Sequence, residues 1–95
     1  MGDNEVSRLL GFEGGVLGLR AYVMMETKPG TSEDVVRRIK ERVKEVVQAD
    51  SIYGRFDAII IIEAPDLDSI KEILYKLVER DPDVVHTETF LALSE

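Results

Sequence analysis

The stretch IYGRFDAIIIIEA, residues 52–64, decides the fold of this chain. A short polar turn containing Asp57 leads directly into an apolar run with four consecutive isoleucines, residues 59–62. Successive side chains of a strand point to opposite faces of its sheet, so this run places two isoleucines on each face. Both faces of the sheet must therefore be covered by another layer of protein.

The length and composition indicate one folded domain. The chain has 95 residues, of which 44% are apolar and 33% are charged, which favours a soluble globular protein over a disordered one. The net charge is −7, and the basic residues between positions 37 and 44 are interrupted by Glu41, as on a solvent-exposed helix face. Nucleic-acid binding depends on clustered cations, so direct DNA binding is not expected.

The absence of cysteine excludes disulfides and thiolate chemistry and is compatible with a reducing compartment. There is no apolar stretch of about 18 residues, so no membrane span is expected. The N-terminus does not follow the pattern of a signal peptide, which makes the cytoplasm the expected location. Scarce amide residues and plentiful charged residues resemble the amino-acid usage of thermophiles.

Apolar periodicity predicts six elements after a glycine-rich, flexible leader over residues 1–16. The first helix is capped by Thr31 or Ser32 and its apolar stripe continues to Val47; the second is capped by Asp66 or Asp68. The predicted strands cover residues 17–27, a short segment ending at Tyr53, residues 56–64 and residues 84–93. This order predicts an α+β, ferredoxin-like β-α-β-β-α-β fold, a four-stranded antiparallel sheet with two helices on one face.

The other face of this sheet exposes isoleucine, methionine and phenylalanine side chains in the predicted arrangement. An apolar patch of that size is unusual on a soluble monomer. We therefore expect an obligate homodimer that packs sheet against sheet, as a dimeric α/β barrel. The alternative is that the leader folds back and covers the face with Leu9, Leu10 and Phe12.

The sequence offers little for catalysis. His86 is the only histidine, and no nucleophile stands beside a base. Aspartate pairs such as Asp81 and Asp83 fall where caps and turns favour aspartate, and no set of metal ligands converges. The glycine-rich leader fits neither a dinucleotide fingerprint nor a P-loop. The expectation is a protein without enzymatic activity, catalytic residues, metal or cofactor.

The turn before the isoleucines is the best candidate for a binding site. Gly54 allows a positive φ and close approach of a ligand, and the Asp57 carboxylate could accept an ammonium group. Backbone amides of the turn could hold a carboxylate, so the combination suits a free amino acid. The alternative is that Gly54 only makes a hairpin, which Asp57 caps.

Residues 21–93 resemble the C-terminal effector domain, the RAM domain, of the Lrp/AsnC (leucine-responsive, feast/famine) transcriptional regulators. The resemblance rests on AYVMMETKPG, YGRFDAIIIIEA, DLDSIKEILYKLV and VVHTETFLAL in that order. The helix-turn-helix usual in the family is missing. The chain thus resembles a stand-alone effector module over residues 17–95.

The resemblance implies dimers formed through the sheets, rings such as octamers, and amino-acid effectors bound between dimers near the turn. It implies a role in regulating the transcription of amino acid metabolism genes, alone or by co-assembly with full-length Lrp/AsnC regulators. The expected ligand-binding residues are Tyr53, Gly54, Arg55, Phe56, Asp57, Thr87 and Thr89. The Asp81-Pro82-Asp83 turn departs from the Gly-Val turn common in the family, and Arg55 stands where acids are common.

Two other functions stay open on the sequence. Small ferredoxin-like dimers include cofactor-free monooxygenases and isomerases, which hold a substrate between helices and sheet. A ligand-free oligomerisation scaffold is the third possibility. A pocket at the turn across a subunit boundary favours the sensor, a pocket inside one subunit favours the enzyme, and no pocket favours the scaffold.

Overall fold

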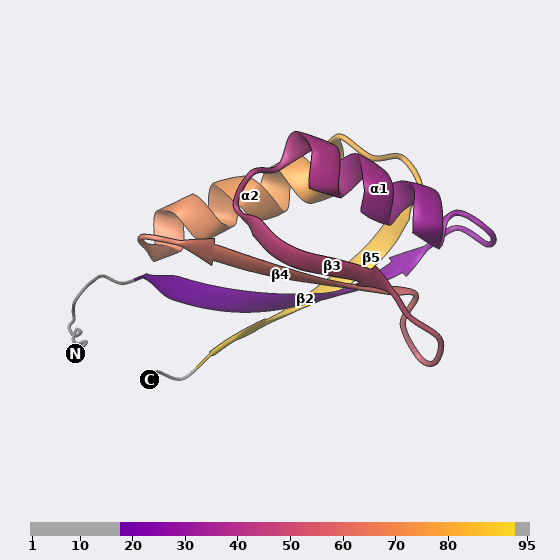
Figure 1. Ribbon diagram of the computed structural model, residues 1–95, viewed down its shortest axis with the longest axis horizontal. Helices are drawn as coiled ribbons and strands as arrows, with labels where there is room; N and C mark the ends of the chain where they lie inside the picture. The colour runs from indigo at the N-terminus through magenta and orange to yellow at the C-terminus, as the bar shows by residue number, and fades with distance from the viewer. Residues whose placement is uncertain (1–17, 93–95) are drawn as a thin grey trace.

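A computed structural model describes residues 18–92 and shows a single sheet covered by two helices on one side (Figure 1). The predicted leader and its alternative role as a cover lie outside these residues. The elements are β2 (Leu19–Thr27), α1 (Ser32–Arg42), β3 (Val46–Ser51), β4 (Ala58–Ala64), α2 (Leu67–Glu79) and β5 (Val84–Leu91). The predicted order of strands and helices is confirmed.

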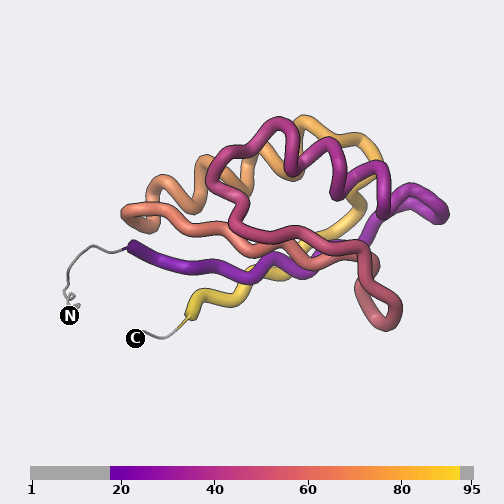
Figure 2. Tube along the Cα trace, viewed as in Figure 1, coloured from indigo at the N-terminus to yellow at the C-terminus, as the bar shows by residue number. Residues whose placement is uncertain are grey.

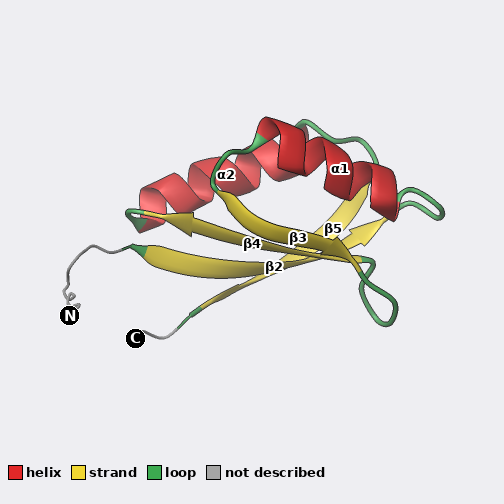
Figure 3. Ribbon diagram, in the orientation of Figure 1, coloured by secondary structure: helices red, strands yellow, loops and turns green. Residues whose placement is uncertain are grey.

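The four strands lie in the order β3-β4-β2-β5, and each neighbouring pair is antiparallel. Both helices pack on the same face, as the two-layer view in Figure 3 shows. This is the ferredoxin-like fold expected from the sequence, with its first and third strands at the centre. Of the helices in residues 18–92, none is long and apolar enough to cross a membrane.

The isoleucine run divides between the two faces of β4 as its alternation predicts. Ile60 and Ile62 are fully buried beneath the helices, while Ile59 and Ile61 on the other face are only partly buried. Tyr22 lies between Ile61 on one side and Phe90 on the other, and Phe90 is 53% exposed. Residues 18–92 therefore leave an apolar surface, which we call the open face, without a second layer.

The first helix is shorter than its apolar stripe predicts. It ends at Arg42, Val43 is extended (φ −116°, ψ 102°), and β3 begins at Val46 rather than near Asp50. The prediction failed because a run of valines fits a strand better than a helix, and pairing of Val46 with Ile62 supplies ladder hydrogen bonds. The strand also ends at Ser51 rather than Tyr53, and β4 begins at Ala58 rather than Phe56.

The helix caps differ in how they work. The Asp66 carboxylate accepts a hydrogen bond from the Ser69 amide at 2.8 Å, which confirms one of the two predicted caps. Thr31 occupies the cap position of α1, but its hydroxyl donates to the Lys28 carbonyl at 2.7 Å instead of accepting from the helix. The position was therefore predicted correctly, and the capping hydrogen bond was not.

Candidate functional site

The predicted binding turn is the loop between β3 and β4. It projects from the end of the sheet, away from the layer of helices (Figure 2). The Ile52 amide donates to the Asp57 carbonyl at 2.9 Å and closes the loop, and the Asp57 amide donates to the Met25 carbonyl at 2.8 Å and fixes it to β2. Gly54 has a φ of +152°, so the turn uses backbone freedom that favours glycine.

Asp57 lies at the foot of this loop and is half-buried. Its Oδ2 accepts a hydrogen bond from the Thr27 amide at 2.9 Å, at the end of β2. This carboxylate oxygen therefore caps the end of β2 and not the hairpin that contains Gly54. An ionised carboxylate can accept about four hydrogen bonds, so one from the backbone leaves capacity for a ligand cation.

The tip of the loop carries a charged and an aromatic side chain in contact. The Arg55 guanidinium carbon lies 5.7 Å from the centre of the Phe56 ring, within the range of a cation–π interaction. Tyr53, on the other side of Gly54, is fully exposed. A cation and two aromatic side chains therefore lie on the short segment that precedes Asp57.

The two predicted threonines lie on β5, away from the loop. Thr87 pairs with Met25, which pairs on its other side with Ala58, so Thr87 is two strands from the loop, about 10 Å by strand spacing. Thr89 pairs with Val23, further along the sheet. Within one chain the structure therefore gathers the five loop residues and leaves both threonines apart from them.

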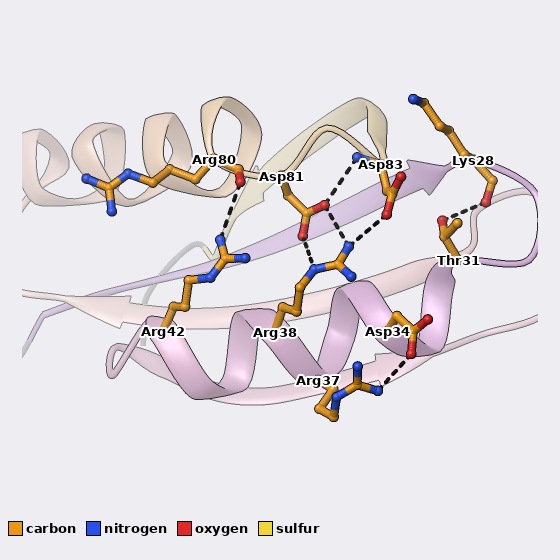
Figure 4. Close-up of polar contacts among 9 residues, drawn as sticks. All are labelled: Lys28, Thr31, Asp34, Arg37, Arg38, Arg42, Arg80, Asp81 and Asp83. Atoms are coloured by element: carbon orange, nitrogen blue, oxygen red, sulfur yellow. Dashed lines mark hydrogen bonds and ion pairs between the residues drawn. The ribbon is translucent and has the colours of Figure 1, made fainter.

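A cluster of charges that the sequence analysis missed lies on the helical side. Figure 4 shows Arg38 of α1 reaching across to the turn between α2 and β5. Its guanidinium donates to both oxygens of Asp81, at 3.0 Å from Nε and 2.8 Å from NH2, and to Asp83 at 2.9 Å. The prediction that Arg38 belongs to a solvent-exposed helix face is therefore wrong. The partners are 43 residues apart, so no local pattern reveals the pair.

Asp81 is 1% exposed, yet it stays ionised. Burial by itself would raise the pKa of Asp81, but hydrogen bonds from Arg38 and from the Asp83 amide outweigh burial and hold this pKa below its ordinary value. The guanidinium gains from the same contact, which raises the pKa of Arg38. The turn between α2 and β5, which contains Asp81 and Asp83, is thus held to α1 by ion pairs with Arg38.

The two acidic turns meet at the C-terminal end of β2. Asp57 accepts from the Thr27 amide, and the next amide, that of Lys28, donates to the Asp83 carbonyl at 2.8 Å. The loop before β4 therefore binds the end of β2 from the β4 side, and the turn before β5 binds it from the β5 side. The loop that carries the candidate site is anchored through this strand end to the ion cluster.

A small cleft lies between the two helices, next to Asp81, with a volume of about 30 Å³. Such a space holds one or two water molecules and not an organic substrate. Among residues 18–92 there is also no group of three or more side chains that could hold a metal ion.

One protein family, the Lrp/AsnC ligand binding domain, matches residues 20–95 of the chain. Comparison with the sequences of curated proteins gives no match. The solved structures similar to this chain include hypothetical protein PHS023 from Pyrococcus horikoshii, at 25% identity and a TM-score of 0.73, with 81% of this chain and 92% of that one covered.

Two larger proteins share the fold at lower identity. AsnC of E. coli is 15% identical with a TM-score of 0.71, and the match covers 94% of this chain and 66% of that one. The transcriptional regulator NMB0573 from Neisseria meningitidis, solved as a complex with L-Met, is 12% identical with a TM-score of 0.70. The match covers 95% of this chain and 65% of that one. At these identities the likeness concerns the fold.

Proposed function

The chain belongs to the family of Lrp/AsnC ligand binding domains, and we propose that it is a sensing and oligomerisation module that binds an amino acid at the loop over Tyr53–Asp57. The observation that carries this proposal is the half-buried Asp57 carboxylate at the foot of a projecting loop, with a single backbone amide as its hydrogen-bond partner among the described residues. A ligand ammonium group is the natural second partner.

The remaining groups of the loop suit the other parts of an amino acid. Gly54 carries no side chain and has open space around it, so a ligand carboxylate can approach the loop amides. Phe56 and Tyr53 offer aromatic surface to a ligand side chain, and Arg55 offers a second anchor for the carboxylate. The site would then bind both charged ends of a zwitterion, which a carboxylate alone would not.

We propose further that two copies pack through the open face. Within residues 18–92, no second layer covers Ile59, Ile61, Tyr22 and Phe90 on this face, and a symmetric sheet-to-sheet contact would remove them from water. Rings of such dimers, with octamers as the expected size, would bring Thr87 or Thr89 of another copy toward a loop. Mass measurement on dilution tests the dimer, and Ile61→Glu should give a monomer.

Calorimetric titration with each of the standard amino acids tests the sensing role, beginning with L-methionine. We expect at least one to bind the wild-type protein and to raise its melting temperature. Asp57→Ala should abolish the heat of binding while the protein remains a dimer. The proposal is wrong if no amino acid gives heat or a thermal shift, or if Asp57→Ala binds as tightly as the wild type.

Ligand binding between subunits would favour the assembled state by its difference in affinity for the two states. Through this effect the chain would modulate transcription of amino acid metabolism genes in the cytoplasm, without catalysis, alone or in mixed assemblies with full-length Lrp/AsnC regulators. Co-purification of a tagged copy with such a regulator, with and without the amino acid, tests the second route.

A further inference from the structure

The exposed side of α2 carries two adjoining hollows that the proposed function does not use. The cleft beside Asp81 continues the space between α1 and α2 and is lined by Arg42, Lys76 and Arg80 together with core residues. A shallower hollow of about 460 Å³ lies next to it and shares Lys76 and Arg80. Its other lining residues are Lys71, Glu72 and Tyr75.

These hollows gather positive charge on an acidic protein. Four of the chain's twelve basic residues line them, namely Lys71, Lys76, Arg80 and Arg42. Of the two acidic residues present, Asp81 is already neutralised by Arg38, which leaves Glu72. Among residues 18–92, none of these four cations has a carboxylate within 4 Å.

The helix dipoles explain only part of this arrangement. Cations are favoured near the C-terminal ends of helices, and Arg42 donates to the Arg80 carbonyl at 3.4 Å (Figure 4). Lys71, however, lies outside the last turn of α2, so the dipole does not account for its position. Lys76 and Arg80 stand four residues apart, a spacing at which like charges repel on a helix. An anion in the hollow would relieve this repulsion.

The aromatic side chain defines what kind of anion fits. Tyr75 follows Lys71 by one helical turn and is 68% exposed. An exposed aromatic ring with cations beside it is the arrangement that stacks a nucleobase while holding its phosphates. The hollow is shallow and lies on the helical side, so a dimer formed through the open face leaves it accessible.

We propose that the hollow over Lys71, Tyr75, Lys76 and Arg80 binds a nucleoside phosphate. Lys76 and Arg80, which line both hollows, would hold the phosphates, and the base would lie on Tyr75 near Lys71. Such a site would give the protein a second ligand, of different chemistry from the amino acid proposed at Asp57 and on the other side of the sheet.

Titration of the full chain with ATP in the presence of EDTA, at low salt, tests this site. We expect saturable binding that weakens as salt is added, since screening reduces attraction between exposed charges. Arg80→Gln should weaken ATP binding by about tenfold, as expected when a charge-assisted contact is lost. Lys40→Gln, which removes an equal charge from α1 outside the hollows, should bind ATP like the wild type.

The aromatic contact has its own pair of variants. Tyr75→Leu should weaken ATP binding by about tenfold, and Tyr75→Phe should leave it unchanged, because stacking needs the ring and not the hydroxyl. Adenosine should bind more weakly than ATP, because it lacks the phosphates. Since Tyr75 is exposed, both variants should fold, and their circular dichroism should match the wild type.

Three results would overturn the inference. The first is the absence of ATP binding, and the second is equal weakening of ATP binding by Arg80→Gln and Lys40→Gln. The third is binding of tripolyphosphate as tight as that of ATP, which would show that the nucleoside does not contribute. Because Asp57→Ala should leave ATP binding intact, a failure here and a failure of the amino-acid site would be told apart.

Discussion

Two aspartates in the two turns that meet at the end of β2 have different partners. Asp57, in the loop before β4, accepts one backbone amide from Thr27 and remains half-buried. Asp81, in the turn before β5, is 1% exposed and has both oxygens bound by the guanidinium of Arg38. The first carboxylate keeps capacity to bind a ligand, and the second has its charge neutralised within the chain.

In the proposed site, the partners of a carboxylate, and not its place in a turn, separate a binding group from a structural one. A buried charge with a fixed guanidinium partner is costly to disturb and has little left to offer a ligand. A carboxylate with one amide partner costs less to disturb and can still accept an ammonium group. Four predictions test this difference, in order of expected effect.

Asp81→Ala should lower the free energy of unfolding by about 3 kcal/mol, because it leaves the partly buried Arg38 with Asp83 alone. The estimate takes the lower end of the range for broken buried pairs, since the Arg38 side chain is 29% exposed. Urea unfolding at fixed protein concentration measures the change. A loss as small as that of Asp34→Ala, which breaks an exposed pair with Arg37, would contradict the structural role.

Acid should reduce the contribution of Asp81. The folded-state pKa of Asp81 lies below its ordinary value, so the stabilisation is complete above the unfolded value of about 4 and is lost as pH falls through the folded pKa. The difference in stability between the wild type and Asp81→Asn should therefore shrink below about pH 4. Unfolding curves between pH 7 and pH 3 measure this; a difference independent of pH would show that ionisation of Asp81 is irrelevant.

Asp57→Ala should cost about 1 to 2 kcal/mol of stability, because it leaves the amide of the buried Thr27 without its acceptor. Asp57→Asn keeps an oxygen for that amide and should recover most of the loss. Neither variant should bind the amino-acid effector, since both lack the negative charge. An Asn variant that binds with wild-type affinity would show that the charge of Asp57 does not hold the ligand.

Gly54→Ala should have the smallest effect on stability, about 1 kcal/mol. A Cβ at this position meets no atom within 4 Å, so the cost is the strain of a φ of +152° and not a collision. Thermal unfolding measures the loss, with Gly30→Ala, at φ +78°, as a matched turn elsewhere. The free energy of binding the amino acid should fall by more than the free energy of unfolding does. An unchanged affinity would place the ligand away from Gly54.

Much of the fold followed from periodicity, and the errors are specific. The isoleucines of β4 divide between two faces as predicted, and Asp66 caps α2 as one of two expected residues. Local pattern was sufficient there because alternation and capping involve neighbours in the chain. Val46 was assigned to the wrong element because valine on a helical stripe fits a strand equally well, and only pairing with Ile62 decides between them.

The candidate site stays a prediction, and its residues differ in how far apart they lie in the chain. Residues 53–57 form one contiguous loop, so the sequence could place them together. Thr87 and Thr89 entered through resemblance to the family, and within one chain they lie on another strand. The sequence contained no sign of the cleft beside Asp81, because its lining combines residues from two helices.

By itself the sequence determined the order of the elements and the presence of apolar side chains on both faces of the central strand β4. Hydrophobic periodicity encodes these properties, since each residue's preference for water or core acts locally. Only the tertiary structure decided where α1 gives way to β3, and that Arg38 neutralises Asp81 across 43 positions of chain. These outcomes depend on which surfaces pack together, and no local interaction specifies that.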